Sequence, residues 1–150
     1  METTKTATAI NDLIVINNDR YEGYKTAASE IKDADLKSLF TDFSNQSKSF
    51  ALELRKFVPS SEEAVKRDET KNTGKLFRMW MDLKSAITGN DRKAILSSCH
   101  FGEDKAKDTY DDVLEHTEDI PSEALGIITK QRSALQKGHD TVKSLRDSIA

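Results

Sequence analysis

The feature that most constrains the fold is a repeating pattern of apolar and small residues in the last part of the chain, residues 128–149. The pattern advances by alternating steps of four and three, through Ile128, Gln131, Leu135, Gly138, Val142, Leu145 and Ile149. This spacing is typical of a helix that packs lengthwise against other helices. The sequence therefore predicts a long terminal helix whose buried face is interrupted by the polar Gln131 and by Gly138.

Two earlier segments repeat the pattern and predict a helical hairpin. The first helix is expected to begin near Ala9, and its buried face comprises Ile10, Ile14, Asn17, Tyr21, Tyr24, Ala28 and Ile31. A short turn at residues 32–35 follows, with Asp35 as N-cap of a second helix that ends near Val58 because Pro59 disfavours helical backbone before it. The face of the second helix is aromatic: Leu36, Leu39, Phe40, Phe43, Ser47, Phe50, Leu54 and Phe57. So short a turn forces the two helices to run antiparallel.

The second half of the chain predicts another pair of long helices and a short additional one. Residues 59–74 are polar and indicate a solvated connection or a short exposed helix, long enough to run the length of a bundle. A helix over residues 76–87 should end at Gly89, and Asn90 or Asp91 should cap the next helix, which stops before Pro121. Alternation of period two is absent over any useful length. The predicted fold is an all-α antiparallel bundle in one domain, residues 1–150.

Composition limits the partners and the compartment. The net charge is −3, with 23 basic and 26 acidic side chains interspersed along the chain, so no basic stripe is available for nucleic acid. No run of about 18 apolar residues predicts a membrane span, and the start lacks the features of a signal peptide. We therefore expect a cytoplasmic protein with no nucleic-acid or membrane partner. Cys99 is the single cysteine and is interpreted as a buried free thiol.

Several polar residues fall on faces that the pattern predicts to be buried: Asn17, Tyr21, Tyr24, Ser47, Tyr110 and Gln131. Two interpretations are open, because these groups either form a polar network in the core or reach the ends of the bundle and water. Glu103 lies beside the small Gly102 and either leans into the bundle or belongs to a solvated flank. His139 is expected at the surface or half-buried. No nucleophile motif, phosphate loop or zinc spacing occurs, so we expect no enzymatic activity.

Particular stretches carry a family resemblance. They are residues 11–24 (NDLIVINNDRYEGY), 46–47 (QS), 80–84 (WMDLK), 102–104 (GED) and 139–140 (HD). The chain resembles a bacterial family of ferritin-like four-helix bundles, within the rubrerythrin and ferritin superfamily, that is catalogued as a domain of unknown function. The resemblance implies a hairpin, a long crossover between helices two and three, and a second helical pair.

The di-iron pattern of that superfamily is largely lost when it is transferred to this sequence. The glutamate position of the first helix falls on Asn17, and the Glu-x-x-His position of the second falls on Gln46-x-x-Ser49 or Ser47-x-x-Phe50. The later pair retains Glu103 and, in the register Gln136-x-x-His139, one histidine. A di-iron centre commonly uses four carboxylates and two histidines. We therefore expect no cofactor and no stoichiometric iron or manganese.

Two functional hypotheses follow. The first is a non-catalytic bundle with a degenerate di-iron site and a structural, interaction or stress-related role, compatible with a homo-oligomer. The alternative is a mononuclear metal or small-ligand binding protein that uses Glu103 and His139, together with Tyr24 or Tyr110. The sequence leaves open which of Gln46 and Ser47 faces the core.

Overall fold

The protein is all-helical over the residues that its structure describes. The computed structural model describes the backbone of residues 2–58 and 74–149, and the side chains of residues 7–58 and 80–149. The helices are α1 (Glu2–Glu30), α2 (Ala34–Arg55), α3 (Gly74–Thr88), α4 (Arg92–Leu114) and α5 (Ser122–Asp147). No strand occurs in these ranges, which confirms the predicted all-α class. None of the described helices combines the length and apolarity that crossing a membrane requires.

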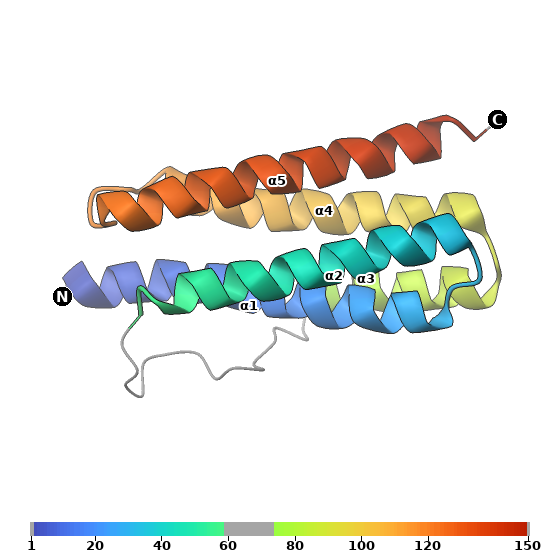
Figure 1. Ribbon diagram of the computed structural model, residues 1–150, viewed down its shortest axis with the longest axis horizontal. Coiled ribbons are helices and arrows are strands. Elements are labelled where there is room, and N and C mark those ends of the chain that lie inside the picture. Colours follow the sequence, from blue (N-terminus) through green and yellow to red (C-terminus); the bar gives the residue numbers. More distant parts are fainter. Residues whose placement is uncertain (1, 59–73, 150) are drawn as a thin grey trace.

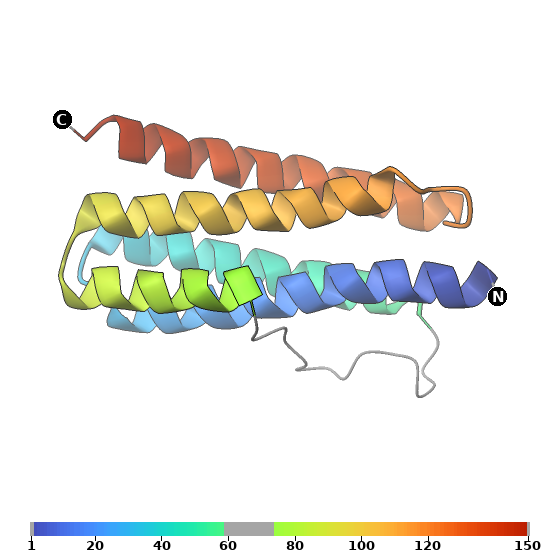
Figure 2. The ribbon, with the colours of Figure 1, turned by 180° about the vertical axis from the view of Figure 1, so that it is seen from behind.

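The helices lie lengthwise beside one another, and sequential neighbours run in opposite directions (Figure 1). α1 packs against α2 along most of its length, and α4 packs against α5. The two pairs meet where α1 contacts α4 and α2 contacts α5. The shorter α3 lies against α4 and α1, as the view from behind shows (Figure 2).

The apolar core is divided into two clusters along the length of the molecule. On α1, one cluster ends at Ile16 and the other begins at Tyr24. On α4, the corresponding gap runs from Cys99 to Ala106. The residues between the clusters include buried polar and charged side chains, notably Arg20 on α1 and Glu103 on α4. The middle of the molecule is therefore a polar layer between two apolar ones.

The pattern that predicted α5 is confirmed for most of its length. Ile128, Gln131, Leu135, Gly138 and Val142 are buried. Leu145 and Ile149 are only half-buried, because the pattern there approaches the end of the helix. The predicted connection over residues 59–74 lies outside the described residues, apart from Gly74, which begins α3.

Helix boundaries differ from the predicted ones at several points. α1 begins at Glu2 rather than near Ala9, and α2 ends at Arg55 rather than near Val58, whereas α4 ends at Leu114, before Pro121 as predicted. The N-cap of α2 is Asp33, whereas Asp35 lies in the first turn of the helix and pairs with Arg92 at 2.7 Å. Boundaries depend on such local contacts, which a periodic pattern does not contain.

The turn between α3 and α4 also differs in detail from the prediction. The residue with left-handed backbone is Asn90, with φ of 55°, and not Gly89. Asparagine tolerates this conformation better than most residues do. Asp91 is the N-cap of α4, and its side chain accepts a hydrogen bond from the Ala94 N–H at 3.1 Å.

Candidate functional site

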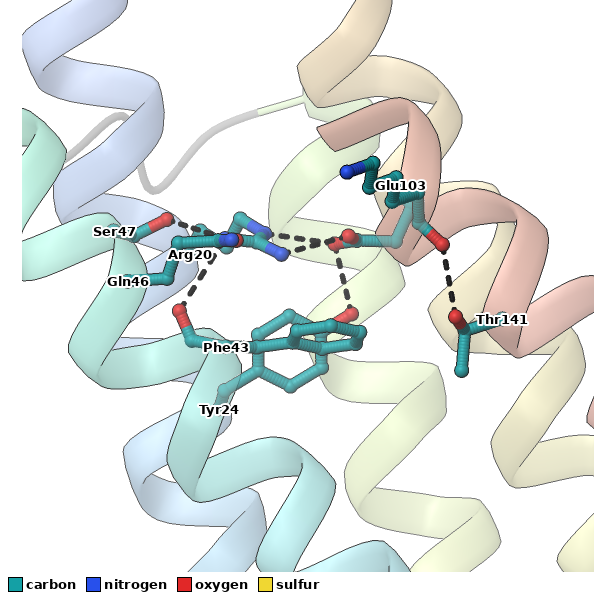
Figure 3. A network of polar contacts seen from close by, with 8 residues as sticks. Arg20, Tyr24, Phe43, Gln46, Ser47, Glu103 and Thr141 are labelled. Atoms are coloured by element: carbon teal, nitrogen blue, oxygen red, sulfur yellow. Dashed lines mark hydrogen bonds and ion pairs between the residues drawn. The ribbon is translucent and has the colours of Figure 1, made fainter. Parts of the chain in front are cut away.

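The centre of the polar layer is an ion pair between Arg20 of α1 and Glu103 of α4 (Figure 3). The Arg20 Nε donates to Glu103 Oε2 at 2.9 Å, and Nη2 donates to Oε1 at 2.8 Å. The side chains are 3% and 1% exposed, respectively. This two-point geometry matches the planar guanidinium to the carboxylate, and it is the strongest form of such a pair.

Arg20 and Glu103 also make hydrogen bonds to other residues. The Arg20 Nη1 donates to Ser47 Oγ at 2.8 Å, to Gln46 Oε1 at 2.9 Å and to the Phe43 carbonyl at 3.3 Å. Glu103 Oε2 accepts a further hydrogen bond from the Tyr24 hydroxyl at 3.0 Å. A buried charge is tolerated when it is paired and hydrogen-bonded in this way.

Aromatic rings of the second apolar cluster border the guanidinium. The Arg20 Cζ lies 4.7 Å from the centre of the Phe43 ring and 5.6 Å from that of Tyr24. Both distances fall within the range of cation–π attraction. The aromatic face predicted for α2 therefore contributes to the polar layer as well as to the apolar core.

Burial and the charge of Glu103 together determine the protonation of Arg20 and Tyr24. Burial alone would lower the pKa of Arg20, but the charge of Glu103 and its hydrogen bonds outweigh that effect, so the pKa lies above its usual value. Burial raises the pKa of Tyr24 well above its usual value, and the negative charge of Glu103 adds to the shift. The arginine is therefore cationic, and the tyrosine is a neutral hydrogen-bond donor at neutral pH.

Gly138 of α5 makes room for the carboxylate. A Cβ at this position would lie 2.9 Å from Glu103 Oε1 and 3.2 Å from the Phe43 ring. Real Cβ atoms are almost never found within 3.0 Å of another group, and a distance of 3.2 Å is closer than most of their contacts. The interruption of the α5 pattern at Gly138 therefore reflects the space that Glu103 occupies.

A second polar network, separate from the pair of Arg20 and Glu103, joins α1, α2, α4 and α5. Asn17 Nδ2 donates to the Tyr110 hydroxyl at 2.8 Å, and this hydroxyl donates to Gln131 Oε1 at 2.6 Å. Gln131 Nε2 then donates to Glu53 Oε1 at 3.0 Å and to the Phe50 carbonyl at 3.3 Å. Burial raises the pKa of Tyr110, so its hydroxyl stays protonated. Asn17, Tyr110 and Gln131 thus form one of the core networks that the sequence left open.

Other predicted residues are placed as follows. Ser47 is buried, and Gln46 is half-buried with its amide oxygen on Arg20, so both face the polar layer. Tyr21 is only half-buried, and Lys25 and Lys48 lie over its ring instead of core residues. The interpretation of Glu103 as part of a solvated flank is wrong, because Arg20 and Tyr24 compensate the cost of its burial.

Cys99 is a buried free thiol, as expected. Burial raises the pKa of this thiol, and the charge of Glu103 adds to the effect. A thiol in such surroundings is a poor nucleophile, because the thiolate is the reactive form. Cys99 therefore contributes packing next to the polar layer.

Arg20 is the important residue that the sequence pattern did not single out. It is three residues after Asn17 and four before Tyr24, so it shares their face of α1. A basic residue on an otherwise buried face, together with a candidate core glutamate on another helix, is the signal that indicates such a pair.

The structure places Glu103 and His139 in different groups. His139 Nε2 lies 2.8 Å from Asp104 Oδ1, and its Nδ1 lies 3.0 Å from Asp140 Oδ1. The His100 ring lies beside it, with 4.5 Å between ring centres. Glu103, in contrast, contacts Arg20 and Tyr24 in the interior. The charge pattern of the sequence did not predict that His100, Asp104 and His139 lie together.

Comparison with known families gives a match over most of the chain. A family model described as a domain of unknown function (DUF2383) matches residues 5–116. The chain belongs to this family. The matched part of the DUF2383 domain contains Arg20, Tyr24 and Glu103, whereas α5, with Gly138 and His139, lies beyond it. No curated protein matches the sequence.

Proposed function

We propose that the protein is a non-catalytic, ferritin-like helical bundle with a structural, interaction or stress-related role. In this proposal an internal ion pair replaces the di-iron centre of ferritin-like relatives. The observation that carries the proposal is the buried, two-point contact between Arg20 and Glu103. The Arg20 guanidinium then balances the charge of Glu103 in place of metal ions.

The arrangement of helices supports the ferritin-like part of the proposal. α1 and α2 form one antiparallel pair, α4 and α5 form another, and the pairs contact each other through α1–α4 and α2–α5. Figure 1 shows α2 and α4 running in the same direction, as a connection along the length of a bundle requires. The family match itself gives no function.

Charge and ligand geometry argue against a pair of metal ions at the centre. Both oxygens of Glu103 already accept hydrogen bonds, and Asn17, at the glutamate position of the first helix, bonds to Tyr110. An Arg20 guanidinium about 4 Å from a metal ion would repel it by about 4 kcal/mol per unit of metal charge at an effective dielectric constant near 20. Metal binding would therefore require the ion pair to break first.

The alternative, a mononuclear site built from Glu103 and His139, has less support. Glu103 would have to release Arg20, which would leave a buried charge without a partner at a cost of several kcal/mol. His139 already faces Asp104 and Asp140 outside the core. No contact among the described residues joins the Glu103 and His139 side chains.

Anaerobic titration with Fe²⁺ and Mn²⁺, followed by metal analysis and by exposure of the Fe²⁺ sample to air, tests the proposal. We expect no binding of two ions per chain and no oxidation of Fe²⁺ beyond the rate in buffer. Glu103→Gln is the matched variant, because it removes the carboxylate that pairs with Arg20 and keeps its shape. Binding of about two ions per chain that is lost in Glu103→Gln would contradict the proposal. A single ion that depends on His139 and is unaffected by Glu103→Gln would not, because it lies at a different position.

A further inference from the structure

The His100, Asp104 and His139 side chains form a compact group on the outer side of the α4–α5 pair. One potential ligand atom from each residue lies within 4.8 Å of the others. His100 and Asp104 are four residues apart on α4, so they share one face of that helix. All three residues are half-buried, which leaves the group accessible to an ion from solvent.

The register between α4 and α5 explains why these residues meet. Gly138 lies against Glu103 in the interior, with the position of its absent Cβ 2.9 Å from Glu103 Oε1. The next residue on each helix is turned outward, so His139 faces Asp104, and their Nε2 and Oδ1 atoms are 2.8 Å apart. The ion pair and the histidine group are thus consequences of one helix register, but they share no side chain.

We propose that His100, Asp104 and His139 bind one divalent transition-metal ion of the Zn²⁺ type, with water completing its coordination. Imidazole nitrogen and carboxylate oxygen are common Zn²⁺ ligands, and three protein ligands plus one water make an open tetrahedral site. Bonds of about 2.0–2.2 Å would separate the ligand atoms by roughly 3.3–3.5 Å. The proposed geometry therefore requires the side chains to rotate from the observed group, in which the ligand atoms lie within 4.8 Å of one another.

Two observations on the histidine rings support the proposal. The His139 Nδ1 lies 3.0 Å from Asp140 Oδ1, an arrangement that holds the proton on Nδ1 and turns Nε2 toward the ion. The His100 Nε2 is buried and has no hydrogen-bond partner among the residues that the structure describes. A metal ion bound through this nitrogen would satisfy it.

Arg146 opposes binding and provides a sharp test. Its Nη1 lies 3.1 Å from His100 Nδ1, and a guanidinium can only donate, so the proton of a neutral His100 lies on Nε2. Coordination by Nε2 requires that proton to move to Nδ1 and Arg146 to turn away. Asp147 already accepts from Arg146 Nη2 at 3.1 Å and can hold the side chain after it moves. Removal of Arg146 should therefore strengthen metal binding.

The experiment is a titration of the full chain with Zn²⁺ in competition with a chromophoric chelator. We expect one Zn²⁺ per chain, with affinity reduced at least about tenfold in His139→Ala and in Asp104→Asn. Asp140→Asn removes only the outer contact to His139 and should weaken binding on the order of 10- to 100-fold. Arg146→Met should tighten it. His116→Ala is the matched control, because His116 is exposed and lies outside the group, and it should bind as the unchanged protein does.

Co²⁺ provides an independent spectroscopic readout. Bound Co²⁺ should give visible d–d absorption without a thiolate charge-transfer band, because Cys99 is not a ligand in the proposed site. Circular dichroism in chelator shows whether each variant is folded, and Asp104→Asn preserves side-chain shape if His139→Ala unfolds the chain. Absence of Zn²⁺ binding, equal affinity in Asp104→Asn, weaker binding in Arg146→Met or a thiolate band would overturn the inference. These outcomes leave the central ion pair untouched, so this inference and the proposed function fail separately.

Discussion

At the scale of single residues, the polar layer shows which contacts make a buried charge tolerable. All three Arg20 nitrogens donate hydrogen bonds, and both Glu103 oxygens accept them. The sequence identified Glu103 as a candidate, but it did not identify the cation opposite, because helical periodicity gives the face of a residue and not its partner across the bundle. Positions 17, 110 and 131 were predicted as polar core residues for the same reason, without their connections.

Gly138→Ala should destabilise the protein through this layer. The new Cβ would lie 2.9 Å from Glu103 Oε1, and the ion pair prevents that carboxylate from moving freely. We expect a cost of about 1–3 kcal/mol in the free energy of unfolding, as is typical of an overpacked site. Urea denaturation followed by circular dichroism measures it.

Gly126→Ala is the matched control on the same helix. Nothing lies within 4 Å of a Cβ at Gly126, so alanine should add helix propensity and stabilise α5 by roughly 0.5–1 kcal/mol. Equal effects of the two substitutions would show that the space at Gly138 is not needed by Glu103.

At the scale of helices, the periodic pattern of the sequence predicted the helices and their buried faces. It did not predict the helix ends that depend on single contacts. The all-α class, the hairpin of α1 and α2 and the buried face of α5 are visible as repeating apolar steps. The start of α1 and the end of α2 were not, because helix ends depend on capping groups and tertiary contacts. Gly89 was predicted at the turn where Asn90 takes the left-handed backbone, since both residue types favour such positions.

At the scale of the whole molecule, stability should fall in alkaline solution. Burial raises the pKa values of Tyr24, Tyr110 and Cys99 in the folded protein above those of the unfolded chain. Their contribution to the free energy of unfolding is complete at pH values below the pKa values of the unfolded chain, near 9 for the thiol and 10 for the tyrosines. It is lost as the pH rises toward the pKa values of the folded protein. Each group then reduces the free energy of unfolding by about 1.4 kcal/mol per pH unit.

Urea denaturation between pH 8 and pH 11 measures this loss, and Tyr110→Phe is the informative variant. It removes one titrating hydroxyl, so the slope above pH 10 should decrease by about 1.4 kcal/mol per pH unit relative to the unchanged protein. Its lost hydrogen bonds to Asn17 and Gln131 lower stability at every pH and do not change the slope. An unchanged slope would mean that Tyr110 ionises as readily in the folded protein as in the unfolded one.

The central claim is that Arg20 and Glu103 balance each other's charge in the interior without metal. A double-mutant cycle of Arg20→Met and Glu103→Leu, measured by urea denaturation at pH 7 in chelator, tests it most directly. Each single substitution leaves a buried charge unpaired and should cost about 3–5 kcal/mol, whereas the double substitution removes both charges. We predict that its cost is at least about 2 kcal/mol below the sum of the single costs. Additive costs would contradict the account.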